Sequence, residues 1–227
     1  YLGLYTLQHR GQESAGIVST DGAQVYRHVG QGLVNDVFSK EAINSLRGTM
    51  AIGHNRYSTT GSDSAMNVQP LLVNTKDGQL ALGHNGNLVN SREIRNLLQD
   101  EGALFQSTTD SELIVHLIAR SSRRTLIEKV KESLCQITGA YSLVMLTPGK
   151  LIAARDPNGI RPLALGKLGD GYIVASETCA MDLVDAEYIR DVEPGEILVI
   201  EKDRLRSERF TEKSVPRSHC IFEFIYF

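Results

Sequence analysis

The chain has 227 residues, of which 41% are hydrophobic and 22% charged, and its formal net charge is −3. This length is enough to bury a sizeable core in one large domain or two small ones. The mild acidity excludes the clustered basic surface that nucleic acid requires, and no apolar run reaches the roughly 18 residues of a membrane span. We therefore expect neither nucleic acid nor a membrane as a partner.

The cysteines are few and scattered. Cys135, Cys179 and Cys220 are widely spaced and form no CxxC pair, so they predict neither a disulfide framework nor a zinc site. None of the six histidines has the HExxH spacing of a zinc enzyme. This usage is typical of a reducing compartment, and we expect a cytoplasmic protein. Cys135 lies in a helical pattern and is expected in the core.

The first half of the chain predicts short strands and polar loops. A short helix is expected at residues 2–8, and strands at 15–20, 24–29, 50–52 and 80–82. The first two strands flank Asp21 and Gly22, a pair typical of a hairpin turn. The last two run into polar loops at 53–63 and 83–87. Loops that follow strands often carry the chemistry of a protein.

Three capped helices are predicted next. In each case Asn or Thr is followed three residues later by Glu, the pattern of a capping box, and then by apolar residues at helical spacing. The three pairs are Asn90 with Glu93, Thr109 with Glu112, and Thr125 with Glu128. Gly102 and Gly139 are expected to end the first and third helices.

From residue 140 onward the pattern changes to short β-rich runs divided by turn residues. These runs lie at 141–146, 151–154, 161–165, 172–175 and 197–200, with a helical interval near 181–185. The first four predict an antiparallel meander. No linker divides the chain, and we expect one α+β domain whose sheets are flanked by helices.

Three polar clusters each suit one part of a small zwitterionic amide. Arg56 follows the strand at 50–52 and can hold a carboxylate through two parallel hydrogen bonds. Asn85 and Gly86 offer two neighbouring N–H donors, as an oxyanion hole requires. Asp110, at a helix start, can hold an ammonium group.

Each cluster also has an ordinary structural explanation. Arg56 can be tied to a structural carboxylate, and Asp110 is favoured at a helix start by the helix dipole alone. Asn85 with Gly86 matches the preferred type I′ hairpin turn, as Asn158 with Gly159 does between two predicted strands. From the residues alone both alternatives stay open at each cluster. None of the three cysteines has a neighbour that marks an activated nucleophile.

Taken together, the clusters resemble a known family. The segments that carry the resemblance are QHRGQESAGI at 8–17, GHNRYSTTG at 53–61, HNGNLVN at 84–90, TTDSE at 108–112, DPNGIRPL at 156–163, EPGE at 193–196 and CIFEFIYF at 220–227. Their order and spacing look like those of the glutaminase domain of glutamine phosphoribosylpyrophosphate amidotransferases. The resemblance covers essentially the whole chain.

The resemblance implies an N-terminal-nucleophile hydrolase fold, a four-layer α-β-β-α sandwich with two mainly antiparallel sheets. It implies that glutamine is hydrolysed to glutamate and that the ammonia converts phosphoribosylpyrophosphate to phosphoribosylamine, the first step of purine synthesis. By the same resemblance Arg56, helped by Thr59, holds the α-carboxylate of glutamine, and Asp110 holds its α-ammonium. Asn85 and Gly86 form the oxyanion hole.

The nucleophile of the family is a cysteine exposed as the first residue. An α-amino group has a pKa near 7.7–8.0, against about 10.4 for lysine, so it can act as the general base for its own side chain. No residue of this sequence can replace that cysteine. We therefore expect it to precede the segment at 2–8 in the longer protein, and we expect the 227 residues alone to be inactive.

Domain organisation and cofactors follow from the same resemblance. Residues 1–216 are expected to form the glutaminase domain and residues 217–227 to begin the connection to a phosphoribosyltransferase domain. The glutaminase domain needs no cofactor, whereas the transferase domain is expected to use Mg²⁺. Cys220 matches a ligand of an iron-sulfur cluster in one branch of the family and a free thiol in others. A homo-oligomer, a dimer or tetramer, is implied.

Two other functions compete with this interpretation. The glutaminase domain of glucosamine-6-phosphate synthase shares the fold and substrate, but Gln8, Tyr57 and the closing segment favour the purine enzyme. A non-catalytic glutamine-binding module is a second alternative, because no nucleophile is present in the sequence. An upstream cysteine in the gene would distinguish the enzyme from the module.

Overall fold

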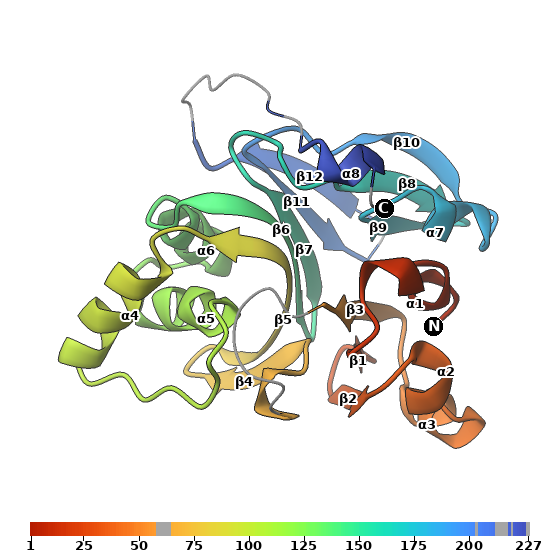
Figure 1. Cartoon of the computed structure of the whole chain (residues 1–227), viewed down its shortest axis with the longest axis horizontal. Coiled ribbons are helices and arrows are strands. Elements are labelled where there is room, and N and C mark those ends of the chain that lie inside the picture. The colour runs from red at the N-terminus through yellow and green to blue at the C-terminus, as the bar shows by residue number, and fades with distance from the viewer. Residues whose placement is uncertain (58–64, 203, 212–217, 219, 226–227) are drawn as a thin grey trace.

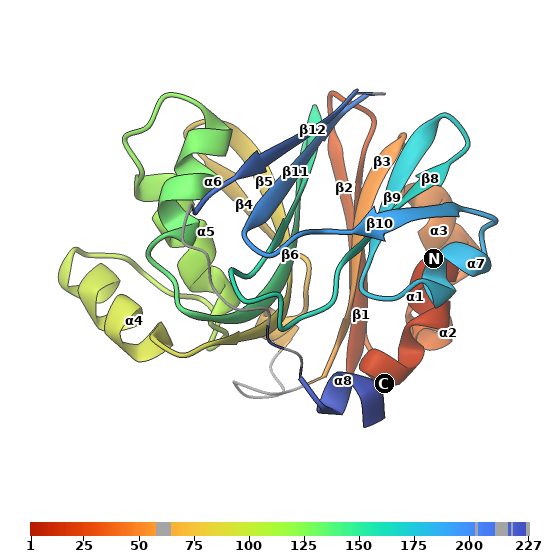
Figure 2. The same ribbon diagram turned by 90° about the horizontal axis from the view of Figure 1, so that it is seen from above.

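The computed structural model describes residues 1–57, 65–202, 204–211, 218 and 220–225. Two β layers are stacked between two helical layers, so the structure is the four-layer α-β-β-α sandwich expected from the sequence (Figures 1 and 2). Figure 2 shows the helices α4 to α6 on one side of the two β layers and α1, α2, α3 and α7 on the opposite side. No helix in the described part of the chain is long and apolar enough to span a bilayer.

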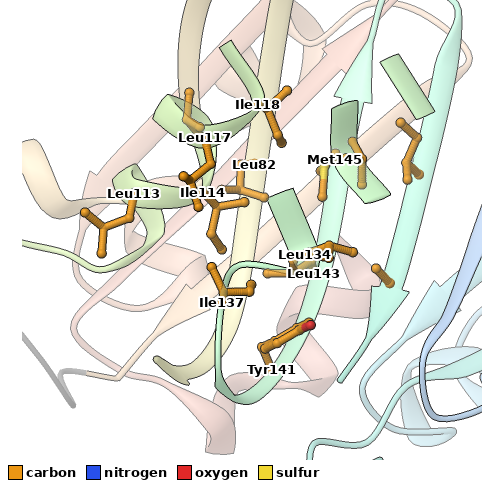
Figure 3. Packing of buried hydrophobic residues seen from close by; sticks show 14 of the residues in the cluster. Leu82, Leu113, Ile114, Leu117, Ile118, Leu134, Ile137, Tyr141, Leu143 and Met145 are labelled. Carbon is orange, nitrogen blue, oxygen red and sulfur yellow. The ribbon is translucent and has the colours of Figure 1, made fainter. Parts of the chain in front are cut away.

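The first β layer is one six-stranded sheet in which all neighbours are antiparallel, in the order β12-β11-β7-β6-β5-β4. Its strands are β4 (Leu71–Thr75), β5 (Gly78–Leu88), β6 (Gly139–Thr147), β7 (Lys150–Arg155), β11 (Glu196–Glu201) and β12 (Arg204–Arg209). The helices α4 (Ser91–Asp100), α5 (Ser111–Arg120) and α6 (Leu126–Leu134) cover its outer face. Figure 3 shows apolar side chains of α5, such as Leu113 and Leu117, gathered with Leu82 and Met145 of the sheet.

The second β layer consists of two three-stranded antiparallel sheets. One has the order β2-β1-β3 and the other β10-β8-β9. The strands are β1 (Ser14–Thr20), β2 (Val25–Gln31), β3 (Met50–Arg56), β8 (Ala164–Leu168), β9 (Gly171–Ala175) and β10 (Glu187–Asp191). The remaining helical segments are α1 (Leu2–Thr6), η1 (Gln8–Arg10), α2 (Val34–Val37), α3 (Lys40–Ser45), η2 (Ala65–Asn67), α7 (Cys179–Asp182) and α8 (Phe222–Ile225). Val18 and Ile52 of this layer pack against Ala81 and Leu146 of the six-stranded sheet.

The two small sheets leave a space between them. Within the described residues, β3 and β9 are the terminal strands of their sheets on the sides that face one another (Figure 2). Both strands line a cavity of about 560 Å³ whose walls include Ile52, Val144 and Val174. Unpaired strand edges beside an apolar space are suited to receive a further extended segment.

The predicted meander is divided between the two β layers. The strands β6 and β7 form a hairpin in the six-stranded sheet, and β8 and β9 form a second hairpin in another sheet. The prediction of one meander was therefore wrong, because sequence periodicity does not say which sheet a strand joins. The short elements α2, α3, β4, β10 and β12 were not predicted.

One of the three predicted capping boxes forms. Thr125 accepts from the N–H of Glu128, and Glu128 accepts from the N–H of Thr125. Asn90 instead donates to Gln136 O and accepts from Thr138 N, which ties α4 to the start of β6. The carboxylate of Glu112 accepts from two N–H groups before its helix, those of Gln106 and Ser107. Tertiary partners replaced the local ones at Asn90, whereas Glu112 bonds N–H groups further upstream in the loop before its helix.

The loop between β7 and β8 is organised around one carboxylate. Asp156 is fully buried, and its two oxygens accept hydrogen bonds from four backbone N–H groups. The donors are those of Tyr141, Asn158, Ile160 and Arg161, at 2.9–3.3 Å. Each buried N–H left without a partner costs free energy.

Replacing Asp156 by alanine is expected to lower the free energy of unfolding by about 3 kcal/mol, because one buried and three partly buried donors lose their acceptor at once. This corresponds to a fall in Tm of about 6–12 °C for a domain of this size. Asp170→Ala, at an exposed turn, is the matched control and should change Tm by less than about 2 °C. Equal shifts for the two variants in differential scanning calorimetry would contradict this role for Asp156.

Candidate active site

The three polar clusters of the sequence meet in one pocket between the β layers. The pocket is lined by residues of β3, β5 and the start of α5, among them Arg56, Asn85, Gly86 and Asp110. These residues lie up to 54 positions apart in the chain, counted from Arg56 to Asp110. The remaining substrate-binding candidate, Thr59, lies outside the described residues.

Arg56 is the last residue of β3. The sequence predicted a position on a loop after the strand, and that prediction was wrong. The ladder with β1 continues to the pair Ser14 and Arg56, which extends the strand through the expected polar segment. Arg56 is 5% exposed, and its NH1 atom lies 3.8 Å from Oε2 of Glu13. A carboxylate partner therefore exists, but the ion pair is long and the Glu13 side chain is 38% exposed. A buried guanidinium that lines a pocket can bind an anionic substrate group.

Asn85 and Gly86 lie inside β5, paired with Ser142 and Tyr141 of β6. The hairpin-turn alternative is therefore wrong for this pair. Gly86 has φ +147, and a Cβ atom there would lie 2.0 Å from Ala140 O, so glycine is required. The Nδ2 atom of Asn85 is buried and has no hydrogen-bond partner among the described residues. By contrast, Asn158 and Gly159 form the expected turn, closed by Gly159 N donating to Asp156 O.

The side chain of Asp110 does not cap its own helix. It stands at the N-cap of α5, yet its Oδ2 atom accepts from Leu88 N at 2.8 Å, and its Oδ1 atom lies 3.5 Å from Nδ1 of His84. Burial favours the neutral acid, but the contact with His84 and the Leu88 N–H outweigh it and hold the pKa of Asp110 below its usual range. The helix-start explanation accounts for the position of Asp110 but not for these bonds. The pocket thus contains an ionised carboxylate.

A buried network below the pocket was missed in the sequence. Gln69 Oε1 accepts from His84 N at 2.7 Å, and Gln69 Nε2 donates to Ser111 Oγ at 3.1 Å. Ser111 Oγ also lies 3.1 Å from His84 Nδ1. His84 and Ser111 stood next to predicted site residues, but Gln69 carried no signal. The network fixes the strand β5 and the start of α5 relative to each other.

Two further arginines reach the rim of the same pocket. Arg10 and Arg161 both line it, and both pair with Glu223 of α8, at 2.8 and 2.7 Å. Arg10 is also bound to Glu177. The helix α8 is therefore connected to the pocket through ion pairs of Glu223 with two lining arginines. The sequence did not predict these ion pairs.

None of the three cysteines lines the pocket. Cys135 is exposed rather than in the core, because it lies at the C-cap of α6, where its thiol donates to Phe210 O. Cys220 is partly buried at the start of α8. The described residues contain no group of three or more His, Cys, Asp or Glu that could hold a metal ion. Ser111 is one of the hydroxyl residues that line the pocket, but as a candidate nucleophile it is 1% exposed and already hydrogen-bonded.

The pocket therefore combines a cationic group, an anionic group and an unpaired amide donor, as binding of an amino-acid amide requires. A family model described as a glutamine amidotransferase domain matches residues 54–182. The chain belongs to this glutamine amidotransferase domain family.

Relatives of known name extend the comparison. The amidophosphoribosyltransferase of Bacillus subtilis is 50% identical over an alignment of 228 residues that covers 100% of this chain and 48% of that protein. Amidophosphoribosyltransferase 1 of Arabidopsis thaliana, a chloroplastic protein, is 45% identical over 100% of this chain and 40% of its own length. A solved structure of glutamine phosphoribosylpyrophosphate amidotransferase from B. subtilis, complexed with ADP and GMP, superposes with a TM-score of 0.94 and 49% identity, covering 99% of this chain and 49% of that one. The chain spans about half the length of these relatives.

Proposed function

We propose that this chain is the glutaminase half of a glutamine phosphoribosylpyrophosphate amidotransferase. The observation that carries the proposal is the pocket itself, in which buried Arg56 and buried Asp110 stand with Asn85 Nδ2, a donor without a hydrogen-bond partner in the described part of the chain. The 50% sequence identity to an amidophosphoribosyltransferase supports this enzyme over other members of the family. The enzyme would hydrolyse glutamine and deliver the ammonia to phosphoribosylpyrophosphate, giving phosphoribosylamine.

The pocket residues divide the substrate between them. Arg56 holds the α-carboxylate of glutamine through charge-assisted hydrogen bonds, with Thr59 as a second donor. Asp110 holds the α-ammonium group, since its carboxylate is ionised and faces the pocket. Asn85 Nδ2 and the Gly86 N–H stabilise the negative charge that develops on the amide oxygen during attack.

The orientation of β5 supports this oxyanion hole. In an antiparallel ladder alternate N–H groups point to the same side. The N–H groups of His84 and Leu88 point away from β6, to Gln69 and Asp110. The N–H of Gly86 lies between them and shares that side by the same alternation. The Gly86 N–H therefore points to the side of Gln69 and Asp110, which line the pocket with it.

A cysteine outside this sequence supplies the nucleophile in our proposal. The space between β3 and β9 suits the extended segment that would carry it, because both strand edges border that space. His54 and Asn85 line both this space and the pocket, so the end of such a segment would reach the oxyanion hole. We infer that residues 1–216 form the glutaminase domain and that residues 217–227 lead to the transferase domain.

The reaction then follows ordinary acyl-transfer chemistry. The α-amino group accepts the thiol proton, and the thiolate attacks the side-chain carbonyl carbon of glutamine. The C–N bond breaks, the nitrogen takes a proton and leaves as ammonia, and a thioester remains. Water hydrolyses the thioester to glutamate and regenerates the thiol. Without the cysteine, the 227 residues are expected to release no glutamate.

Cofactors and assembly complete the proposal. The glutaminase domain uses none, and Mg²⁺ serves the transferase domain. An iron-sulfur cluster at Cys220 would need its other ligands outside the described residues. We favour a free thiol at Cys220 and a cytoplasmic homo-oligomer. Visible absorption of the anaerobically reconstituted full-length protein distinguishes a cluster from a thiol.

The function is tested with the full-length protein. Glutamate formation from glutamine should depend on the N-terminal cysteine, and pyrophosphate should be released when phosphoribosylpyrophosphate is added. Glutamine binding without any turnover would favour the non-catalytic module. Ammonia transfer to fructose 6-phosphate in place of phosphoribosylpyrophosphate would favour the glucosamine-6-phosphate synthase alternative.

A further inference from the structure

The ring of His54, on β3, crosses to the strand that carries the oxyanion hole. Its Nε2 atom lies 3.0 Å from the carbonyl oxygen of His84, and that carbonyl belongs to the peptide unit that joins His84 to Asn85. We propose that His54 is a positioning residue, which holds this peptide and thereby sets Asn85 and Gly86 for catalysis. The inference rests on the proposed glutaminase function.

The hydrogen bond defines the tautomer of His54. A carbonyl oxygen only accepts, so Nε2 must carry the hydrogen. The Nδ1 atom is then the unprotonated nitrogen, and it is buried without a hydrogen-bond partner among the described residues. Among the described residues, the one hydrogen bond of the ring is the donation from Nε2.

The location of the bond explains why it is needed. The strand β4 pairs with β5 only as far as Leu71 opposite Leu82, so residues 83–88 of β5 lack a neighbouring strand on that side within the described chain. Side chains replace the missing ladder hydrogen bonds. The side chain of Gln69 accepts from the N–H of His84, and the ring of His54 donates to the carbonyl oxygen of His84. At the C-terminal end of β5, the carboxylate of Asp110 accepts a hydrogen bond from the N–H of Leu88. The segment that carries Asn85 and Gly86 is therefore held at both ends and open in the middle.

The neutral state of His54 allows its Nε2–H to donate the same hydrogen bond at all pH values above its pKa. Burial is the largest cause that lowers the pKa of His54, to about 4; the bond to the His84 carbonyl opposes it, and the charges of His84 and Arg56 add to it. In the described part of the chain, these two residues are the titratable and charged groups that act on the ring, from β5 and from β3 itself. At pH values above that pKa the ring is neutral and keeps a single Nε2–H.

The substitutions His54→Asn and His54→Gln distinguish a role of His54 in positioning the peptide from a role in filling space. The side-chain nitrogen of glutamine reaches the place of Nε2, whereas that of asparagine reaches only the place of Nδ1. In the full-length enzyme His54→Asn should lower kcat for glutamine hydrolysis about 10- to 50-fold, less than the loss of a direct oxyanion donor, with KM for glutamine changed less than about twofold. His54→Gln should restore kcat to within about threefold of the parent.

A second histidine provides the matched control. His28 of β2 makes the same kind of bond, from Nε2 to Val37 O at 2.9 Å, but it does not line the pocket. Both His28→Asn and His28→Gln should leave kcat and KM within about twofold. Equal loss of kcat in His54→Asn and His54→Gln, or no loss in His54→Asn, would overturn the positioning role.

Nitrogen NMR of the imidazole gives a readout independent of activity. The ¹⁵N shifts of His54 in the full-length protein should show protonated Nε2 and unprotonated Nδ1 from pH 8 to pH 5. A proton on Nδ1, or a doubly protonated ring at pH 6, would contradict the inference even if all variants folded. If the parent enzyme released no glutamate while these shifts were as expected, the proposed function would fail and the hydrogen bond would stand.

Discussion

Replacing Asn85 by alanine is expected to lower kcat for glutamine hydrolysis about 100- to 1,000-fold, the typical loss for one oxyanion-hole donor. The amide nitrogen is buried in the pocket without a partner among the described residues, so its hydrogen bond is available for the transition state. Because the ground-state amide oxygen carries less charge than the oxyanion, KM for glutamine should change less than about threefold. Steady-state kinetics of the full-length enzyme measure both constants.

The chain offers its own control for this variant. Asn158 is also followed by glycine, but it lies in the turn after β7 and does not line the pocket. Asn158→Ala should leave kcat within about twofold. A tenfold rise in KM with unchanged kcat in Asn85→Ala would mean that Asn85 binds the substrate in its ground state instead.

Replacing either charged residue of the pocket is expected to act on binding. Arg56→Ala removes two charge-assisted hydrogen bonds, and at about 1.5–3 kcal/mol each the KM for glutamine should rise about 100-fold or more. Asp110→Asn removes the counter-charge of the ammonium group and should raise KM about 10- to 100-fold. Arg123→Ala, whose arginine pairs with Glu132 at an exposed site, should leave KM unchanged. Unchanged KM in both pocket variants would refute the substrate map.

The pH dependence of KM tests the ionised state of Asp110. Its pKa in the folded protein lies below the usual carboxyl range, so the charge is present above that pKa and is lost only as pH falls through it. Between pH 8 and pH 5 the contribution of Asp110 to KM should therefore be constant. A rise in KM centred near pH 6 that disappears in Asp110→Asn would show a raised pKa and contradict this assignment.

The sequence predicted the parts of the site but not how they are combined. The polar clusters at Arg56, Asn85 and Asp110 were identified as candidates because a carboxylate, an oxyanion and an ammonium group each need one of these residue types. Local patterns left each of them open to an ordinary explanation. Only the tertiary structure, which stacks the sheets of β3 and β5 and bonds Asp110 to Leu88 of β5, brought the three into one pocket.

The errors have a common physical cause. Both polar segments that follow apolar strands, at residues 53–56 and 83–87, proved to be strand, because neighbouring strands provide hydrogen bonds that periodicity does not register. The side chain of Asn90 found tertiary partners, and that of Glu112 bonded the loop before its helix, in place of the predicted capping bonds. Gln69 gave no signal, since its role depends on β4 beginning only at Leu71, which leaves the N–H of His84 without a strand partner on that side in the described chain. Such roles are decided by tertiary structure.

The most direct test of the account is the site of covalent labelling by a diazoketone analogue of glutamine, which alkylates the nucleophile held at the amide carbonyl. Mass spectrometry of the labelled full-length protein should find one equivalent on an N-terminal cysteine outside these 227 residues, with protection by glutamine. Asp110→Asn should slow the labelling, because the analogue carries the same ammonium group. Label on Cys135, Cys179, Cys220 or Ser111, or labelling that glutamine does not prevent, would contradict the account.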